Sequence, residues 1–227
     1  MTVEDLIKKS PVRKLDKALG GEGLKAGEFG VICSEKGVGK TSLLVQLGID
    51  ELMQGNKVIH ISFSQDIDYS LTWYNNMYNE LAKRKNLERA EDIKNEIVAN
   101  RIILNFNQDT ITSDNIMKTV EALTEGTNAK PHALMIDDFD FTKAEKEAIS
   151  QLKKAAKELG VCIWFTARAD VQNETPKSLE PFLENIDVVL FLKPISKTEV
   201  SVTALKEHKN KNVPIDLKFD TKSLLLI

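Results

Sequence analysis

The chain has 227 residues, of which 42% are hydrophobic and 29% are charged, with 11 glycines and 6 prolines. This composition is typical of a folded globular protein and excludes a disordered or collagen-like chain. The net charge of -3 at neutral pH argues against a strongly basic nucleic-acid coat protein. No window holds the roughly 18 consecutive apolar residues of a membrane-spanning helix, and the acidic N-terminal segment lacks the apolar stretch of a secretory signal. We therefore expect a single cytoplasmic domain over residues 1–227, with no membrane insertion.

Apolar runs alternate with longer amphipathic segments, a pattern that predicts an α/β fold with a mostly parallel sheet between two layers of helices. In chain order we expect a strand at 29–33, a helix at 41–54, a strand at 57–63, helices at 70–83 and 87–100, a strand at 101–106, a helix at 113–124, a strand at 132–136, a helix at 142–159, and strands at 161–165 and 187–192. Short apolar runs at 200–205, 215–219 and 224–227 predict antiparallel strands that extend the sheet at its C-terminal end.

Residues 34–41, Ser-Glu-Lys-Gly-Val-Gly-Lys-Thr, match the phosphate-loop pattern G-x-x-x-x-G-K-[ST] except at the first position, where Ser34 replaces glycine. The expected strand before this loop and the expected helix after it are the context that the pattern requires. Backbone N–H groups of such a loop bind phosphate oxygens, the lysine reaches the β- and γ-phosphates, and the threonine hydroxyl binds Mg²⁺. The expected nucleotide-binding residues are therefore Ser34, Glu35, Lys36, Gly37, Val38, Gly39, Lys40, Thr41 and Ser42.

A second acidic element follows the apolar run at 132–136, which ends in Asp137 and Asp138. A buried strand that ends in a carboxylate is the pattern that delivers a metal-binding residue to the phosphate loop. We expect Asp137 to hold Mg²⁺, or one of its waters, together with Thr41. Asp138 is the second choice for this role, because adjacent side chains on a strand point in different directions.

These elements, in this order, resemble the RecA-like ATPases, and among them the KaiC and DnaB-helicase ATPase domains, over most of the chain. The segment 58–66, VIHISFSQD, is similar to the second core strand, after which the family carries a glutamate that activates the attacking water; Asp66 takes that place. The segment 162–168, CIWFTAR, resembles the strand whose polar end senses the γ-phosphate, here Arg168. The segment 202–208, VTALKEH, resembles the strand whose K-x-R signature reaches the nucleotide of a neighbouring subunit. Lys206 matches this signature, and His208 stands at the arginine position.

The resemblance implies a three-layer RecA-like fold, ATP and Mg²⁺ as ligands, and a homo-oligomer with nucleotides between subunits. It implies a catalytic set of Lys40, Asp66 and Asp137, and further nucleotide contacts from Arg168, Lys206 and His208. Two departures predict slow hydrolysis. Asp66 is one methylene shorter than glutamate, and a misplacement of about 1 Å can cost on the order of a hundredfold in rate. Histidine is mostly neutral near pH 7 and lacks the bidentate geometry of arginine.

Two alternatives remain open at this stage. The same departures, together with Ser34, favour a regulatory or scaffold module that binds ATP and barely hydrolyses it, in which Asp66 only caps a helix. A DNA-dependent recombinase or helicase is the other alternative. The loop at 170–185 argues against it, because an acidic loop repels phosphates; its charged residues are Asp170, Glu174, Glu180 and Glu184 against Lys177. We therefore expect a protein partner more than a nucleic acid.

The remaining candidate signals favour structural roles. Trp73 could stack on a base, but its helical spacing to Met77 and Leu81 is more typical of a core or subunit-contact stripe. The three histidines are scattered without metal-ligand spacing, so we expect no zinc site. The two cysteines, Cys33 and Cys162, are expected to fill buried strands. No guanine-recognition signature is present, which favours ATP over GTP.

Overall fold

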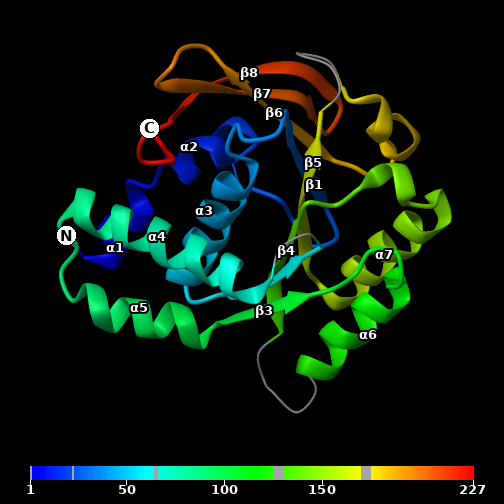
Figure 1. The fold of residues 1–227 in the computed structure, drawn as a ribbon, viewed down its shortest axis with the longest axis horizontal. Helices are drawn as coiled ribbons and strands as arrows, with labels where there is room; N and C mark the ends of the chain where they lie inside the picture. Colours follow the sequence, from blue (N-terminus) through cyan, green and yellow to red (C-terminus); the bar gives the residue numbers. More distant parts are fainter. Residues whose placement is uncertain (1, 22, 64–65, 125–129, 170–174) are drawn as a thin grey trace.

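The computed structural model describes all residues except 1, 22, 64–65, 125–129 and 170–174, and in this part of the chain the strands form one sheet of nine in the order β3-β2-β4-β5-β1-β6-β7-β8-β9 (Figure 1). The strands are β1 (Phe29–Ser34), β2 (Lys57–Ser62), β3 (Arg101–Asn105), β4 (Pro131–Asp137), β5 (Cys162–Arg168), β6 (Val188–Pro194), β7 (Glu199–Glu207), β8 (Asn210–Asp220) and β9 (Leu225–Leu226). The pairs from β3 to β6 are parallel and those from β6 to β9 are antiparallel. The predicted mostly parallel sheet with an antiparallel C-terminal extension is therefore confirmed.

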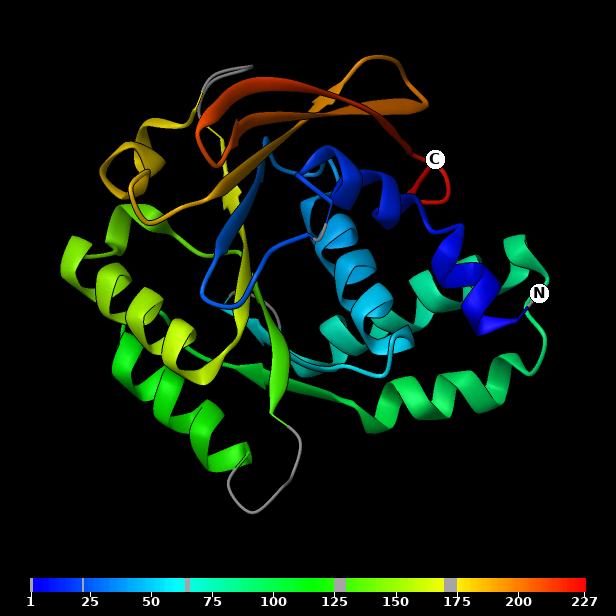
Figure 2. The same cartoon turned by 180° about the vertical axis from the view of Figure 1, so that it is seen from behind.

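Helices cover both faces of the parallel part of the sheet (Figures 1 and 2). The helices are α1 (Val3–Lys8), α2 (Pro11–Ala18), α3 (Lys40–Met53), α4 (Ile67–Lys85), α5 (Ala90–Ala99), α6 (Ser113–Thr124) and α7 (Lys146–Leu159), with short 3-10 segments η1 (Phe141–Lys143) and η2 (Lys177–Phe182). One apolar core joins α1 to α5 to one face of the sheet, and a second joins α6, α7, η1 and η2 to the other face. This is the predicted three-layer α/β arrangement.

Strand β1 shows why two cores form. Its side chains alternate between the faces, so Phe29, Val31 and Cys33 belong to the core under α6 and α7, whereas Ile32 belongs to the core under α3. Every residue of β1 is buried, because β5 and β6 flank it and helices cover it on both sides. The strand is thus a rigid base for the loop that follows it.

The structure differs from the sequence-based prediction at three places. Helices α1 and α2 were not predicted; their N-caps Thr2 and Ser10 accept backbone hydrogen bonds, and Leu6 and Leu15 are buried. Strand β8 is 11 residues long instead of the predicted five-residue strand at 215–219, because a register shift between Ser201 and Thr203 lets its first half pair with β7 as well. The helix predicted at 142–159 begins only at Lys146, after the η1 turn.

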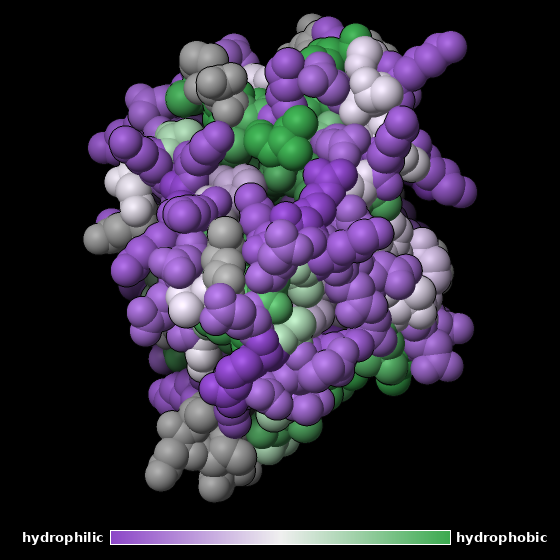
Figure 3. Space-filling model, turned by 90° about the vertical axis from the view of Figure 1, so that its left-hand side faces the viewer, coloured by the Kyte–Doolittle hydropathy of each residue, from purple (hydrophilic) through white to green (hydrophobic). Residues whose placement is uncertain are grey.

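The face that carries α1, α4 and α5 is mostly hydrophilic, with small hydrophobic areas toward the upper end (Figure 3). Helix α4 ends in the basic run Lys83, Arg84 and Lys85, and Arg84 is paired with Glu80 and Asp220. Among the helices that the structure describes, none combines the length and the apolar character needed to cross a bilayer.

A candidate nucleotide site at the carboxyl ends of the parallel strands

The predicted phosphate loop connects β1 to α3 at the edge of the sheet where β1, β4 and β5 end. In this position the loop lies beside the last residues of β4 and β5, which include Asp137 and Arg168. Parallel α/β sheets bind ligands at this edge, because the loops and helix N-termini converge there. The fold therefore brings together residues that are about 130 positions apart in the sequence.

The loop has the backbone shape that anion binding requires. Gly37 and Gly39 have φ angles of 82° and 119°, in the region that a side chain disfavours. Gly39 is the N-cap of α3 and supplies no side chain to the first N–H groups of the helix, which leaves them able to bind an anion at the positive end of the helix dipole. Ser34 is fully buried, and its hydroxyl donates to the Glu35 carbonyl at 2.9 Å, so serine fits where the pattern has glycine.

Lys40 lies across the mouth of this loop. Its Nζ donates to the carbonyl oxygens of Ser34 and Glu35, at 3.2 and 3.0 Å. Burial lowers the pKa of Lys40, and the nearby carboxylates of Asp138 and Asp137 oppose this shift. A buried ammonium held only by carbonyl oxygens gains from a phosphate, because the phosphate supplies the opposite charge that the carbonyls lack.

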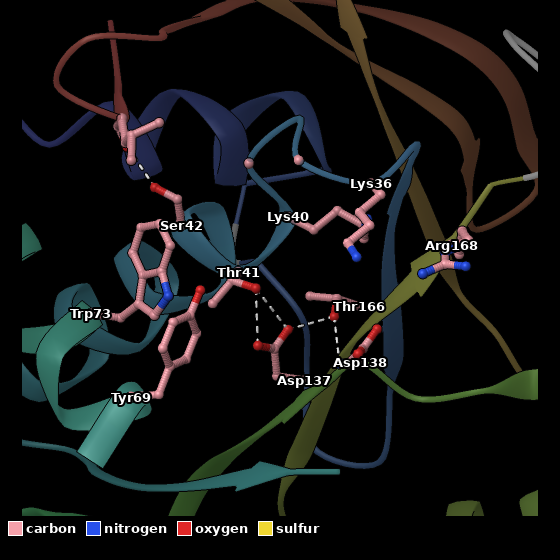
Figure 4. Close-up of a pocket in the computed structure, with 13 residues that line it drawn as sticks. Lys36, Lys40, Thr41, Ser42, Tyr69, Trp73, Asp137, Asp138, Thr166 and Arg168 are labelled. Carbon is pink, nitrogen blue, oxygen red and sulfur yellow. Dashed lines mark hydrogen bonds between the residues drawn. The ribbon is translucent and has the colours of Figure 1, made fainter. Parts of the chain in front are cut away.

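Thr41, Asp137 and Thr166 form a hydrogen-bonded chain below the loop (Figure 4). The Thr41 hydroxyl donates to Asp137 Oδ2 at 2.9 Å, and the Thr166 hydroxyl donates to Asp137 Oδ1 at 2.6 Å. Burial raises the pKa of Asp137, while the two hydroxyl donors lower it. A hydroxyl and a carboxylate at this distance are the hard oxygen donors that Mg²⁺ accepts alongside substrate phosphates. The described residues contain no group of three or more acidic, histidine or cysteine side chains that could hold a metal without such phosphates.

The space around these groups is a cavity of about 300 Å³. Its lining includes Lys36, Gly37, Gly39, Lys40, Thr41, Ser42, Tyr69, Trp73, Asp137, Asp138, Thr166, Arg168 and Leu224. Tyr69 and Trp73, on the first turns of α4, form an edge-to-face pair with centroids 6.2 Å apart, and the Tyr69 ring is 43% exposed. The wall beside them is fixed by Ser42, whose hydroxyl donates to the Leu224 carbonyl at 2.7 Å. Trp73 thus faces the cavity as well as packing against the core.

A second cavity of about 430 Å³ adjoins the first, and Asp138 and Arg168 line both. It continues past the ends of β4 and β5 and is also lined by Asp140, Thr142 and Ser178. The end of the nucleotide cavity next to Lys40 and Asp138 therefore opens into a further polar space. The predicted acidic residues Asp170 and Glu174 of the neighbouring loop lie outside the described residues.

The other predicted site residues lie away from this cavity. Asp66 is the N-cap of α4 and accepts the Tyr69 N–H at 2.8 Å; it does not line the cavity among the residues described. Lys206 and His208 lie at the opposite edge of the sheet, level with the start of β6. Lys206 donates to the carbonyls of Leu183 and Ile186. Val38 is half-buried and packs against the core, and Glu35 contributes its carbonyl to Lys40.

His208 is held by two carboxylates at that opposite edge. Its Nδ1 lies 2.7 Å from Glu207 Oε1, and its Nε2 lies 3.0 Å from Glu28 Oε1. The hydrogen bond with Glu207, supported by Glu28, raises the pKa of His208. Neither His208 nor Lys206 can therefore reach the nucleotide cavity of its own chain.

The sequence analysis did not assign Thr166, Tyr69 or Leu224 to the site. Thr166 lies within the expected sensor strand, two residues before the assigned Arg168, and the alternation of side chains along a strand was the signal that could have found it. Tyr69 lies one helical turn before Trp73, so the same face of α4 could have been extended to it. Nothing in the sequence pattern indicates the contact of Leu224, because it depends on how the C-terminal segment crosses α3.

Comparison with known proteins agrees with this geometry. No protein-family model matches the chain. A stretch of 53 residues is 43% identical to DNA repair protein rhp55 of Schizosaccharomyces pombe; the stretch is 23% of this chain and 15% of that protein. Among solved structures, the ATPase domain of a DnaB-like helicase superposes with a TM-score of 0.68 at 17% sequence identity, over 100% of this chain and 91% of that chain. The chain therefore has the RecA-like fold of a DnaB-type helicase ATPase domain, with a P-loop at the expected place.

Proposed function

We propose that the chain binds ATP with Mg²⁺ in the cavity of about 300 Å³ and slowly hydrolyses its β–γ phosphoanhydride bond. The observation that carries the proposal is the Thr41 hydroxyl 2.9 Å from Asp137, directly below a glycine loop at the N-terminus of α3. A chance glycine turn has no reason to place a buried carboxylate there. The fold shared with the helicase ATPase domain supports the same conclusion.

Each residue has a defined role in this proposal. The loop N–H groups and Lys40 bind the β- and γ-phosphates, and Thr41 and Asp137 hold Mg²⁺, which supplies charge neutralisation between the phosphates. Tyr69 and Trp73 offer ring faces to the adenine. Arg168, on β5, adds a positive charge near Lys40. Together these groups stabilise the charge that develops on the transferred phosphoryl group.

Slow hydrolysis and assembly into a homo-oligomer follow from the same residues. Phosphoryl transfer is fastest when an arginine completes the charge around the γ-phosphate, and the described cavity offers Arg168 from the chain itself. A second copy would have to contribute Lys206 and His208, which lie at the opposite edge of the sheet. We place this activity in the cytoplasm, where buried unpaired thiols such as Cys33 and Cys162 persist.

The proposal is tested by ATP binding and phosphate release in wild type and Lys40→Ala. We expect ATP with Mg²⁺ to change the fluorescence of Trp73, and Lys40→Ala to weaken binding by about tenfold or more, because a buried phosphate contact to a charged group is lost. Lys118→Ala is the matched control, since Lys118 is an exposed lysine on α6 that pairs with Asp114, away from the cavity. Binding that survives Lys40→Ala unchanged contradicts the proposal.

Two further candidates are separated by the same assay. ATP binding without phosphate release would favour a regulatory or scaffold module. DNA-dependent hydrolysis is favoured by the name of the matched DNA repair protein, and it predicts that single-stranded DNA raises the rate. Glu180 and Glu184, beside the second cavity, argue against a phosphate backbone there. A rate unaffected by DNA at low salt removes this candidate.

A further inference from the structure

The carboxylate expected to orient the attacking water, Asp66, is already used elsewhere. Its side chain accepts the Tyr69 N–H at 2.8 Å and caps α4, and it does not line the nucleotide cavity in the described structure. Moving Asp66 into the cavity would sacrifice the N-cap of a 19-residue helix. A different carboxylate is therefore needed beside the γ-phosphate.

Asp138 is placed where that carboxylate is needed. It follows the last residue of β4, is exposed, and lines both the nucleotide cavity and the second cavity. Asp138 acts electrostatically on Lys40, as does Arg168, and Figure 4 shows all three on the same side of the cavity. The Asp138 side chain thus lies at the end of the cavity where the γ-phosphate would be, next to space that can admit water.

The backbone of Asp138 is held firmly in this position. Its φ of 58° is in the left-handed region, which aspartate tolerates better than most residues. Its N–H donates to the Thr166 hydroxyl at 2.7 Å, and the next N–H, of Phe139, donates to the Thr166 carbonyl at 3.0 Å. This double tether to β5 turns the Asp138 side chain out of the sheet and toward the cavities. The same Thr166 hydroxyl also binds Asp137, so the positions of the two carboxylates are linked.

The neighbouring carboxylates are less available. Both oxygens of Asp137 accept hydroxyl hydrogen bonds. Asp140 Oδ1 accepts from the N–H and the hydroxyl of Thr142, at 3.0 and 2.6 Å. The Asp138 carboxylate, by contrast, accepts no hydrogen bond and makes no ion pair with the residues that the structure describes.

We propose that Asp138, and not Asp66, orients the water that attacks the γ-phosphate; this inference rests on the proposed ATP site. The water donates a hydrogen bond to the Asp138 carboxylate, which points one of its lone pairs at phosphorus. The water oxygen forms a bond to the γ-phosphorus while the bond from phosphorus to the β–γ bridging oxygen breaks. The electron pair of the broken bond leaves with ADP, and one water proton passes to an oxygen of the released phosphate. Little proton abstraction is needed in such a loose transition state, so orientation is the main contribution.

The test compares two matched substitutions, Asp138→Asn and Asp66→Asn. Asparagine keeps the shape of both side chains; it tolerates the left-handed φ at position 138 and is an equally good N-cap at position 66. We expect Asp138→Asn to lower kcat by about a hundredfold while the Kd for ATP changes by less than about threefold. Asp66→Asn should leave kcat within about twofold. Asp138→Glu, which keeps the carboxylate, should recover part of the rate.

A second readout does not depend on turnover. ADP with aluminium fluoride mimics the transferred phosphoryl group together with its attacking water. Wild type and Asp66→Asn should bind this complex about tenfold more tightly than ADP, and Asp138→Asn should lose most of that preference.

The outcomes separate the two proposals. A loss of rate or of aluminium fluoride preference in Asp66→Asn as large as that in Asp138→Asn overturns the assignment, as does an Asp138→Asn variant that behaves like wild type. A wild type that binds ATP but shows no preference for the aluminium fluoride complex also overturns it, because no water is then oriented. Failure of the wild type to bind ATP at all defeats the proposed function itself.

Discussion

Replacing Thr166 by valine tests the hydrogen-bonded chain that joins the two carboxylates to β5. Thr166 is 1% exposed, so its hydroxyl is not replaced by bulk water. Valine keeps the shape and suits a strand, but it removes the bond to Asp137 at 2.6 Å and leaves the Asp138 N–H without its acceptor. A hydrogen bond to a charged group contributes about 1.5–3 kcal/mol, and an orphaned, partly buried N–H costs about 1 kcal/mol. The expected loss in the free energy of unfolding is therefore about 3 kcal/mol.

Urea denaturation of the nucleotide-free protein measures this loss. For a chain of this length the loss corresponds to a fall in Tm of about 6–12 °C. Thr166→Ser is the control, because it keeps both hydrogen bonds and loses one methyl group, at about 1 kcal/mol. If Thr166→Val is as stable as Thr166→Ser, the hydroxyl makes neither bond and the linked placement of Asp137 and Asp138 is wrong.

Two further predictions concern packing and pH. A Cβ at Gly48 would lie 2.6 Å from the Tyr74 hydroxyl oxygen, so Gly48→Ala should destabilise by about 1–3 kcal/mol, and adding Tyr74→Phe should restore most of that; urea midpoints that show additive losses contradict the clash. His208→Asn, which suits the left-handed φ of 49° at that position, should lower Tm more at pH 6 than at pH 8.5. The hydrogen bond with Glu207 raises the pKa of His208, so its contribution is complete below about pH 6.5 and is lost as the pH rises through the raised pKa. An equal deficit at both pH values argues against a protonated His208.

The sequence was sufficient to predict the parts of the fold that depend on local patterns. Strand β1, the phosphate loop and α3 follow from an apolar run, two glycines and an amphipathic segment in succession, and the loop itself has few alternatives once Gly37 and Gly39 are in place. The pairing of Asp137 with Thr41 was also predictable, because parallel strands bring their carboxyl ends to one edge.

What could not be predicted depends on contacts between distant segments. Asp66 could be either a helix cap or a water-orienting residue, and only the placement of α4 relative to the cavity separates the two roles. The length of β8 depends on an irregular register with β7, which leaves no mark on the hydrophobic alternation. Helices α1 and α2 have 6 and 8 residues, too short for a clear helical period, and are stabilised by packing on α3 and β8.

The two edges of the sheet explain why a second copy matters for the proposed reaction. Val189, the partner of Lys206 in β7, pairs with Val31 in β1, three residues before the end of that strand at Ser34. His208 lies further toward the opposite edge, so it is roughly 15 Å from the loop along the strand direction. A nucleotide bound at the loop of one copy can meet these side chains only from another copy. In the single chain both side chains are already bonded, Lys206 to backbone carbonyls and His208 to two carboxylates. A contact between copies must therefore replace existing bonds and gains less than a free arginine would, which is a physical reason for slow hydrolysis even in an assembled state.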